Sequence, residues 1–320
     1  MIVDCHVHVC ATMPGHGTVS PRLRRRLSFL FMRWRLGVSF FAGDDQIERE
    51  VEARLVQTVQ QTPELDAAVV LALDQVYGDD GRPNAADTDL YVTNEYAAEV
   101  AHNHAKLLFG ASVHPYRHDA LAELERCVLA GAVLVKWLPV VQNINPADER
   151  CLPFYEFLAH HRLPLLCHTG GELSLPYVNF AYADPELLVP ALQRGVTVIA
   201  AHCGTRSRPF EKDCLPVFLR LAREHERLYG DTAALNLPTR SYSYEALLKH
   251  EEVRRNLVHG SDWPIISVPP ARAGRLKALR LLAAEGNWMR RDVLAKQALG
   301  FDNAYWHRAA TLLRLPGDGG

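Results

Sequence analysis

The sequence lacks several features that mark common classes of protein. No run approaches the roughly 18 consecutive apolar residues that a membrane-spanning helix needs. Lys and Arg number 35 against 37 Asp and Glu, so the formal net charge is −2, which excludes a general polyanion binder. Gly and Pro, at 20 and 19, are too few for a linker-dominated or collagen-like chain. The composition, 48% hydrophobic and 22% charged, is that of a globular protein for which we expect no nucleic-acid or membrane partner.

Cysteine usage points to a reducing compartment. The seven cysteines are odd in number and include no CxxC pair. No basic and then apolar leader precedes the strand-like run at residues 2–9. Unpatterned thiols without a secretion signal are typical of the cytosol, so we expect a cytoplasmic protein.

Eight short apolar or β-branched runs alternate with longer amphipathic stretches. They lie at about 2–9, 67–73, 107–113, 131–138, 163–168, 196–202, 226–232 and 256–262. From the third run onward their starts are about 24 to 33 residues apart, the size of one βα unit. Eight such units indicate an α/β fold, a (β/α)8 TIM barrel. An open doubly wound sheet is the alternative, although no GxGxxG motif follows any strand.

The barrel is expected to be a single domain over residues 1–315, closed by helices within 290–313 and followed by a flexible tail at 316–320. An inserted helical lid, at about 10–45, follows the first strand at the active end of the barrel. Its segment 21–41 interleaves six arginines with apolar residues. Solvated or acid-paired arginines are the first interpretation, and an anionic-substrate funnel or an oligomer contact is the second. A membrane-surface or nucleic-acid arm is the third.

Six side chains suited to metal chemistry lie at the ends of predicted strands: His6, His8, Lys136, His168, His202 and Asp262. Side chains two apart on a strand point the same way, so His6 and His8 project together. A single histidine at a strand end is more often a hydrogen-bonded loop residue. The combination at one end of a barrel instead indicates a metal site, because imidazole and carboxylate bind divalent metals.

These motifs resemble those of a known family. His6-x-His8, Cys-His168-Thr-Gly, Ala-His202-Cys-Gly and Gly-Ser-Asp262-Trp-Pro are similar to the motifs of the amidohydrolase superfamily. More narrowly, they resemble the amidohydrolase-related branch that contains the aminocarboxymuconate semialdehyde decarboxylase-like enzymes. Residues 298–304 (ALGFDNA) also resemble the closing helix of that branch.

The resemblance implies a ligand set. His6, His8, His168 and Asp262 would hold one divalent metal, with Zn²⁺ expected, and His202 would orient or deprotonate the bound water. Other superfamily members hold two metals bridged by a carbamylated lysine of strand 4, with the histidines of strands 5 and 6 on the second ion. Lys136 and His202 stand where that arrangement needs them. Both arrangements stay open, and the branch slightly favours one metal.

The chemistry expected is hydrolysis of a C–N or C–O bond in a small amide, cyclic imide or lactone by a metal-activated water. Asp262 accepts the water proton and passes it to the leaving group, while His202 steadies the oxyanion or shares the base role. The alternative is metal-dependent, non-oxidative decarboxylation of an unsaturated or aromatic acid. A second alternative is a non-catalytic metal-binding barrel that docks through the Arg-rich segment.

Four further residues are candidates for substrate contact: His114, Trp137, Glu172 and Arg206. Arg206 would grip a substrate carboxylate, if the substrate is anionic, and Trp137 and His114 would wall the pocket. Surface solvation and structural packing are the alternatives. Glu172 and Asp231 are expected to tune the site, and Cys5 to face the surrounding helices. A homo-oligomer is left open.

Overall fold

The structure, a computed structural model, describes residues 1–315, so the tail expected at 316–320 lies outside the described residues. Eight parallel strands form one sheet in chain order: β1 (Val3–His8), β3 (Ala67–Leu71), β5 (Leu107–Ala111), β6 (Leu134–Trp137), β7 (Leu165–His168), β8 (Val198–Ala201), β9 (Leu228–Asp231) and β10 (Leu257–Val258). Each strand lies within one of the eight predicted runs. The backbone N–H groups of Cys5 and His8 donate to the carbonyls of His259 and Trp263, at 3.1 and 2.8 Å. These bonds join the two edges of the curled sheet, as in a TIM barrel.

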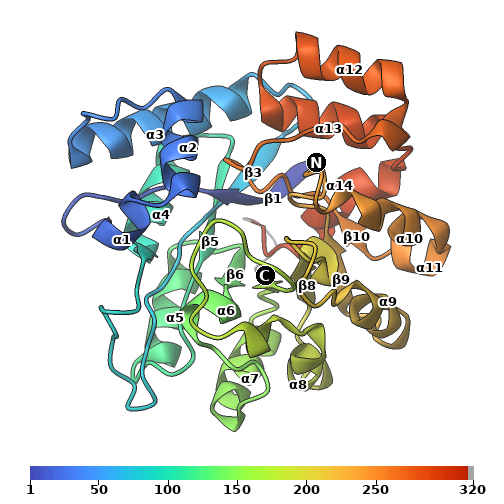
Figure 1. The fold of residues 1–320 in the computed structure, drawn as a ribbon. Helices are drawn as coiled ribbons and strands as arrows, with labels where there is room; N and C mark the ends of the chain where they lie inside the picture. The colour runs from blue at the N-terminus through green and yellow to red at the C-terminus, as the bar shows by residue number, and fades with distance from the viewer. Residues whose placement is uncertain (316–320) are drawn as a thin grey trace.

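Helices surround the strands (Figure 1). They are α3 (Asp44–Gln60), α4 (Asn94–Asn103), α5 (Ala120–Leu129), α6 (Pro139–Gln142), α7 (Leu152–His160), α8 (Val189–Gln193), α9 (Leu215–Glu224), α10 (Tyr244–Lys249), α11 (Glu251–Arg254), α12 (Arg275–Ala284), α13 (Trp288–Ala298) and α14 (Asn303–Leu312). Ile47, Val51, Leu55 and Val59, spaced four residues apart, lie on the buried face of α3. The helices expected within 290–313 are present as α13 and α14.

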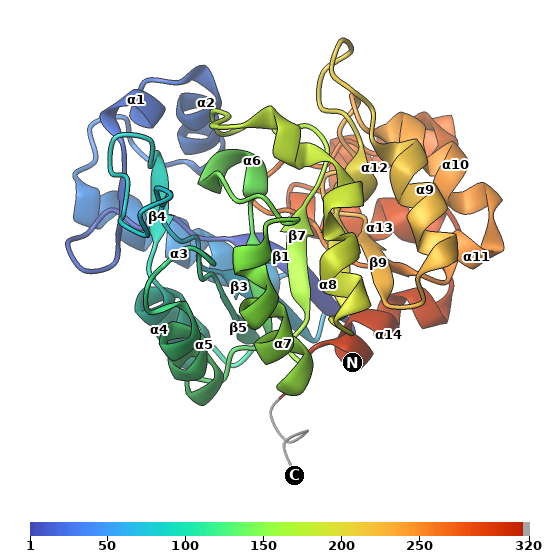
Figure 2. The same ribbon diagram turned by 90° about the horizontal axis from the view of Figure 1, so that it is seen from below.

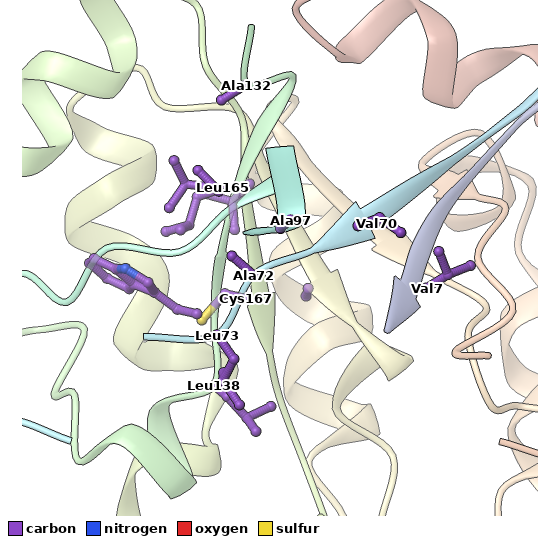
Figure 3. Packing of buried hydrophobic residues seen from close by; sticks show 14 of the residues in the cluster. Val7, Val70, Ala72, Leu73, Ala97, Ala132, Leu138, Leu165 and Cys167 are labelled. Carbon is purple, nitrogen blue, oxygen red and sulfur yellow. The ribbon is translucent and has the colours of Figure 1, made fainter. Parts of the chain in front are cut away.

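Side chains alternate between the helix side and the interior of the barrel. Val7, Val70, Leu165 and Cys167 belong to the large apolar cluster between strands and helices (Figure 3). A smaller cluster that fills the barrel interior contains Val69, Leu71, Leu134, Leu166 and Ile199. Lys136 and His168 follow Leu134 and Leu166 on the same face of their strands, at the end of the barrel where the strands finish.

Cys5 belongs to the interior cluster, so its expected position facing the helices was wrong. The pairing of β1 with β3 shifts register between Asp4 and Val7, which marks a β-bulge. A bulge inserts one extra residue and interrupts the alternation of faces. His6 and His8 nevertheless remain on the interior side, as predicted.

The segment between β1 and α3 contains β2 (Gly17–Val19), α1 (Pro21–Arg24) and α2 (Leu27–Leu36). β2 pairs antiparallel with β4 (Leu90–Val92), a small sheet that the apolar pattern did not predict. α1 begins at Ser20, whose side chain accepts a hydrogen bond from Leu23 N, and α2 ends at Gly37 with φ of 75°. In Figure 2, α1, α2 and α6 lie at the side of the molecule opposite the N-terminus.

Two of the six arginines in this segment pair with acids. Arg22 Nε lies 2.9 Å from Asp89 Oδ1, and Arg24 Nη1 lies 2.5 Å from Asp44 Oδ1. The expected helices are therefore present, and closure of the segment as a lid stays a prediction. Within residues 1–315, no helix has the length and apolar character needed to cross a membrane.

Candidate active site

The six predicted metal-site side chains converge at the carboxyl ends of the strands. His6 and His8 come from β1, Lys136 from β6, His168 from β7, and His202 and Asp262 from the residues that follow β8 and β10. His6 Nε2 lies 3.2 Å from His8 Nε2 and 3.4 Å from Asp262 Oδ1. His8 Nε2 is 3.1 Å from the same carboxylate oxygen.

The other two histidines join this cluster. Ligand atoms of His6, His202 and Asp262 all lie within 4.8 Å of one another. The ring centroids of His168 and His202 are 4.8 Å apart, and those of His6 and His202 are 5.2 Å apart. Four imidazoles and one carboxylate thus share one end of the barrel.

Hydrogen bonds fix the tautomers of two of these rings. His6 Nδ1 lies 2.7 Å from Asp231 Oδ2, and His202 Nδ1 lies 2.9 Å from the carbonyl of Ala233. Because a carbonyl or a carboxylate only accepts, each Nδ1 carries the proton. In a neutral ring Nε2 then carries a lone pair, and in both histidines this atom faces the cluster. Asp231 therefore orients His6, as expected of a tuning residue.

His168 offers a buried nitrogen without a partner. Its Nε2 makes no hydrogen bond within residues 1–315, and its Nδ1 lies 3.7 Å from Glu172 Oε2. Burial lowers the pKa of His6, His168 and His202 well below the usual value, so these rings are neutral at pH 7. Neutral imidazole is the form that binds a metal, and buried polar atoms are normally satisfied. The residues present therefore fit a divalent cation.

The carboxylate of Asp262 and the amine of Lys136 lie at the same cluster. Burial raises the pKa of Asp262, but the hydrogen bond with His8 and the positive charge of Lys136 contribute to outweighing it, so the pKa lies below its usual range and the carboxylate is ionised. Burial lowers the pKa of Lys136, although Asp231 and Asp262 oppose this effect. Lys136 Nζ lies 3.2 Å from His6 Nε2.

The backbone is strained at two of the clustered residues. His202 and Asp262 have φ of 61° and 64°, in the left-handed region that non-glycine residues seldom adopt. Asp231 Oδ1 accepts from the backbone N–H of His202 at 2.8 Å, and the N–H of Asp262 donates to the carbonyl of His6 at 2.9 Å. Such strain is typical of functional sites, where surrounding bonds hold a side chain in one direction.

A cavity of about 170 Å³ opens beside the cluster. The six clustered side chains and Glu172 form its polar wall. Its other walls are largely apolar, and the inserted segment contributes Leu23, Phe29, Met32 and Leu36 together with Arg33. A substrate here contacts the inserted segment and the cluster at once.

The structure brings only Glu172, among the four expected substrate contacts, to this cavity. Trp137 packs against Phe154, with ring centroids 4.9 Å apart, on the helix side of β6. Arg206 lies over the Tyr242 ring, 5.0 Å from its centroid. Neither Trp137 nor Arg206 is among the described residues that line the cavity.

His114 also lies away from the cavity lining. Both of its ring nitrogens have protein partners: Nε2 is 2.9 Å from the carbonyl of Gln142, and Nδ1 accepts from the N–H of Tyr116 at 3.2 Å. Because Nδ1 accepts, Nε2 carries the proton and donates it. This histidine holds loops together and has no nitrogen left for a substrate.

A buried arginine near the site was not predicted. Arg240 Nη1 donates to the carbonyl and to Oγ1 of Thr205, at 3.1 and 2.7 Å, and Nη2 donates to the carbonyl of Gly171. It thereby ties the loop after β7 to the loop after β8, and burial lowers its pKa. Arg240 lies in a Pro-Thr-Arg-Ser loop outside any strand run, so no periodic signal marked it.

Comparison with known proteins identifies a matching family and several similar solved structures. A family model described as amidohydrolase matches residues 3–299. An uncharacterised TIM-barrel protein from Bordetella bronchiseptica is similar in structure, with a TM-score of 0.64, 16% identity, and coverage of 97% of this chain and 96% of that one. A probable 2-pyrone-4,6-dicarboxylic acid hydrolase from Acinetobacter baumannii, with citric acid bound, has a TM-score of 0.53 at 15% identity, covering 94% and 99%. No curated protein matches the chain.

Proposed function

Because this chain belongs to the amidohydrolase family, as its motifs predicted, we propose that it is a metal-dependent hydrolase of a small amide, cyclic imide or lactone. The observation that carries the proposal is the position of Asp262. Its carboxylate is ionised, lies within 3.4 Å of two imidazole nitrogens, and faces a cavity. A carboxylate so placed can accept a proton from water and return it to a leaving group.

His6, His8, His168 and Asp262 would hold one divalent metal, and the imidazole-rich donor set favours Zn²⁺. If Lys136 is carbamylated, it would hold a second ion together with His168 and His202. A divalent cation in either arrangement lowers the pKa of a water that it binds to about 7 and polarises a carbonyl group.

Asp262 performs the proton transfers in this proposal. Since its pKa is held low, it begins as a carboxylate and accepts a proton from the attacking water. The protonated Asp262 then donates to the nitrogen or oxygen that leaves as the C–N or C–O bond breaks. The bond formed is C–O to the water oxygen, so no oxidant or reductant is needed.

His202 is assigned the role of acceptor. Its Nδ1 proton is committed to the carbonyl of Ala233, so the neutral ring presents a lone pair at Nε2. This supports metal binding or orientation of the water, and argues against donation to a substrate oxyanion. The apolar walls from Phe29 and Met32 exclude bulk water and suit a substrate with an apolar body.

The test is turnover in ¹⁸O-labelled water with metal-loaded enzyme and a panel of amides, cyclic imides and lactones. We expect one labelled oxygen per product molecule, and kcat lowered about 10²- to 10⁴-fold in Asp262→Asn. Asp292→Asn, which alters a buried carboxylate on α13, is the matched control and should keep kcat. Release of CO₂ from unsaturated or aromatic acids, without label in the product, would establish the decarboxylase alternative instead.

A further inference from the structure

The inserted helix α2 has two apolar faces, only one of which is used by the cavity. Phe29, Met32 and Leu36 line the cavity. Leu27, Phe31 and Trp34, spaced by four and three residues, follow the opposite face and are exposed. Phe40 and Phe41 come after the helix and are exposed as well; these five side chains are called the aromatic patch below.

The aromatic patch is a concentrated feature of the surface. Leu27 is 84% exposed, Trp34 60% and Phe41 99%. Residues 27–41 hold five of the fifteen exposed large hydrophobic side chains found within residues 1–315. Scattered single apolar residues need no explanation, but a contiguous group indicates an interaction surface.

The same segment is strongly basic. Residues 21–41 contain six arginines and no Asp or Glu. Arg22 and Arg24 are paired with acids, whereas the other four make no salt bridge with any residue in the described part of the chain: Arg25, Arg26, Arg33 and Arg35. Arg33 lines the cavity and lies over the patch ring of Phe40 at 5.8 Å, and Arg35 lies 5.7 Å from the Trp34 ring and 5.0 Å from the Trp288 ring.

We propose that the aromatic patch docks on an anionic phospholipid surface. Exposed Trp, Phe and Leu next to unpaired arginines is the pattern by which interfacial helices bury apolar side chains among lipid headgroups and attract their phosphates. A second copy of the chain fits this surface less well, because a two-fold axis would set the arginines of two copies of residues 21–41 against each other, and this segment contains no acid. The near-neutral charge of the whole chain gave no indication of this partner; the local exposure does.

The position of α2 relates docking on lipid to the cavity. α1 and α2 lie at the edge of the molecule at the strand ends, on the side away from the N-terminus (Figure 2). With the patch in the headgroup layer, α2 would stand between the lipid and the cavity that its other face lines. Docking itself depends only on this surface, so it stands or falls independently of the proposed hydrolysis.

The experiment measures binding of the full-length protein to vesicles of phosphatidylcholine, with and without phosphatidylserine, by co-sedimentation and tryptophan emission. We expect binding to the anionic vesicles only, weakened by salt, with a blue shift in emission. The shift should largely disappear in Trp34→Phe while binding remains, because Trp137, Trp263 and Trp306 are buried and Trp288 is only partly exposed.

Paired variants separate insertion from simple charge attraction. Leu27→Ser with Phe41→Ser should weaken vesicle binding at least tenfold, through loss of apolar transfer energy. Arg25→Gln with Arg26→Gln should weaken it about 25-fold. The matched control is Leu276→Ser with Leu279→Ser, which alters two exposed leucines on α12 and should leave binding unchanged.

Four outcomes would overturn the proposal. The first is absence of binding to either kind of vesicle, and the second is binding that survives Leu27→Ser with Phe41→Ser. The third is equal binding to a single-stranded oligonucleotide, which would show attraction to polyanions in general. The fourth is self-association without lipid that the same two substitutions abolish, which would assign the patch to an interface between copies of the chain.

Discussion

Replacing Asp231 by Asn should weaken metal binding without unfolding the protein. The two oxygens of Asp231 accept three hydrogen bonds: Oδ2 from His6 Nδ1 at 2.7 Å, and Oδ1 from the N–H groups of His202 and Ala233 at 2.8 and 3.1 Å. Only an acceptor at both positions satisfies this set. An asparagine amide presents an NH₂ group either to the two backbone donors or to His6.

Each orientation has a cost. With NH₂ toward His6, the ring must carry its proton on Nε2, and this removes the lone pair from the cluster. With NH₂ toward the backbone, two buried N–H groups lose their acceptor. A buried unsatisfied donor costs about 1–3 kcal/mol. Turning the amide so that His6 regains its Nε2 lone pair would therefore make the free energy of metal binding less favourable by a similar amount. Metal affinity should therefore fall roughly 5- to 150-fold, in line with the 10- to 100-fold typical of such supporting residues.

The assay is competition for Zn²⁺ between the protein and a chelator of known affinity, with thermal unfolding measured in parallel. Asp292→Asn is the control, since it alters another buried carboxylate, paired with Lys296 at 2.5 Å, that does not line the cavity. That control should lose stability and keep its metal affinity. Equal affinity in Asp231→Asn and the wild type would refute the argument that Asp231 sets the His6 tautomer.

Two further predictions follow from the site. In His8→Ala, the affinity for Zn²⁺ should be weaker than in the wild type but nearly constant from pH 7.5 to 6. The reason is that burial lowers the pKa of His6 and His168, so protons do not compete with the metal for these rings. A steep loss of affinity near pH 6.5 in the chelator assay would contradict this. Arg240→Lys should lower the free energy of unfolding by about 1–3 kcal/mol in urea titrations, since a lysine cannot reach both loops that Arg240 joins. The control is Arg206→Lys, which alters a half-buried arginine and should change the free energy of unfolding little. Arg240→Lys with unchanged stability would mean that this arginine does not hold the loops.

The positions of the strand-end residues could be predicted because two properties of parallel strands determine them. The period of two sets which face a side chain takes, and the common direction of the strands brings their ends together. His168 and Lys136 follow from this rule. The same rule applied to Trp137, the neighbour of Lys136, places it on the helix side, where it packs against Phe154. Its expected role as a pocket wall ignored that alternation.

Residues in loops could not be placed by the same reasoning. Arg240 and Arg206 both follow strand ends, and nothing in their neighbouring sequence separates the one that is buried beside the site from the one that lies over Tyr242. The β-bulge in β1, which turns Cys5 inward, likewise leaves no mark in a run of alternating apolar residues. Loop paths depend on tertiary packing, and a periodic pattern does not report it.

The central claim is that the strand-end cluster binds a divalent cation. Its most direct test is the metal content of the purified, metal-loaded and desalted protein, measured by elemental analysis with native mass spectrometry and compared with His6→Ala and His168→Ala. The account predicts about one ion per chain, or two with the added mass of one CO₂ on Lys136, and loss of metal in both variants. A wild-type protein that retains no ion, or variants that retain as much as the wild type, would contradict it.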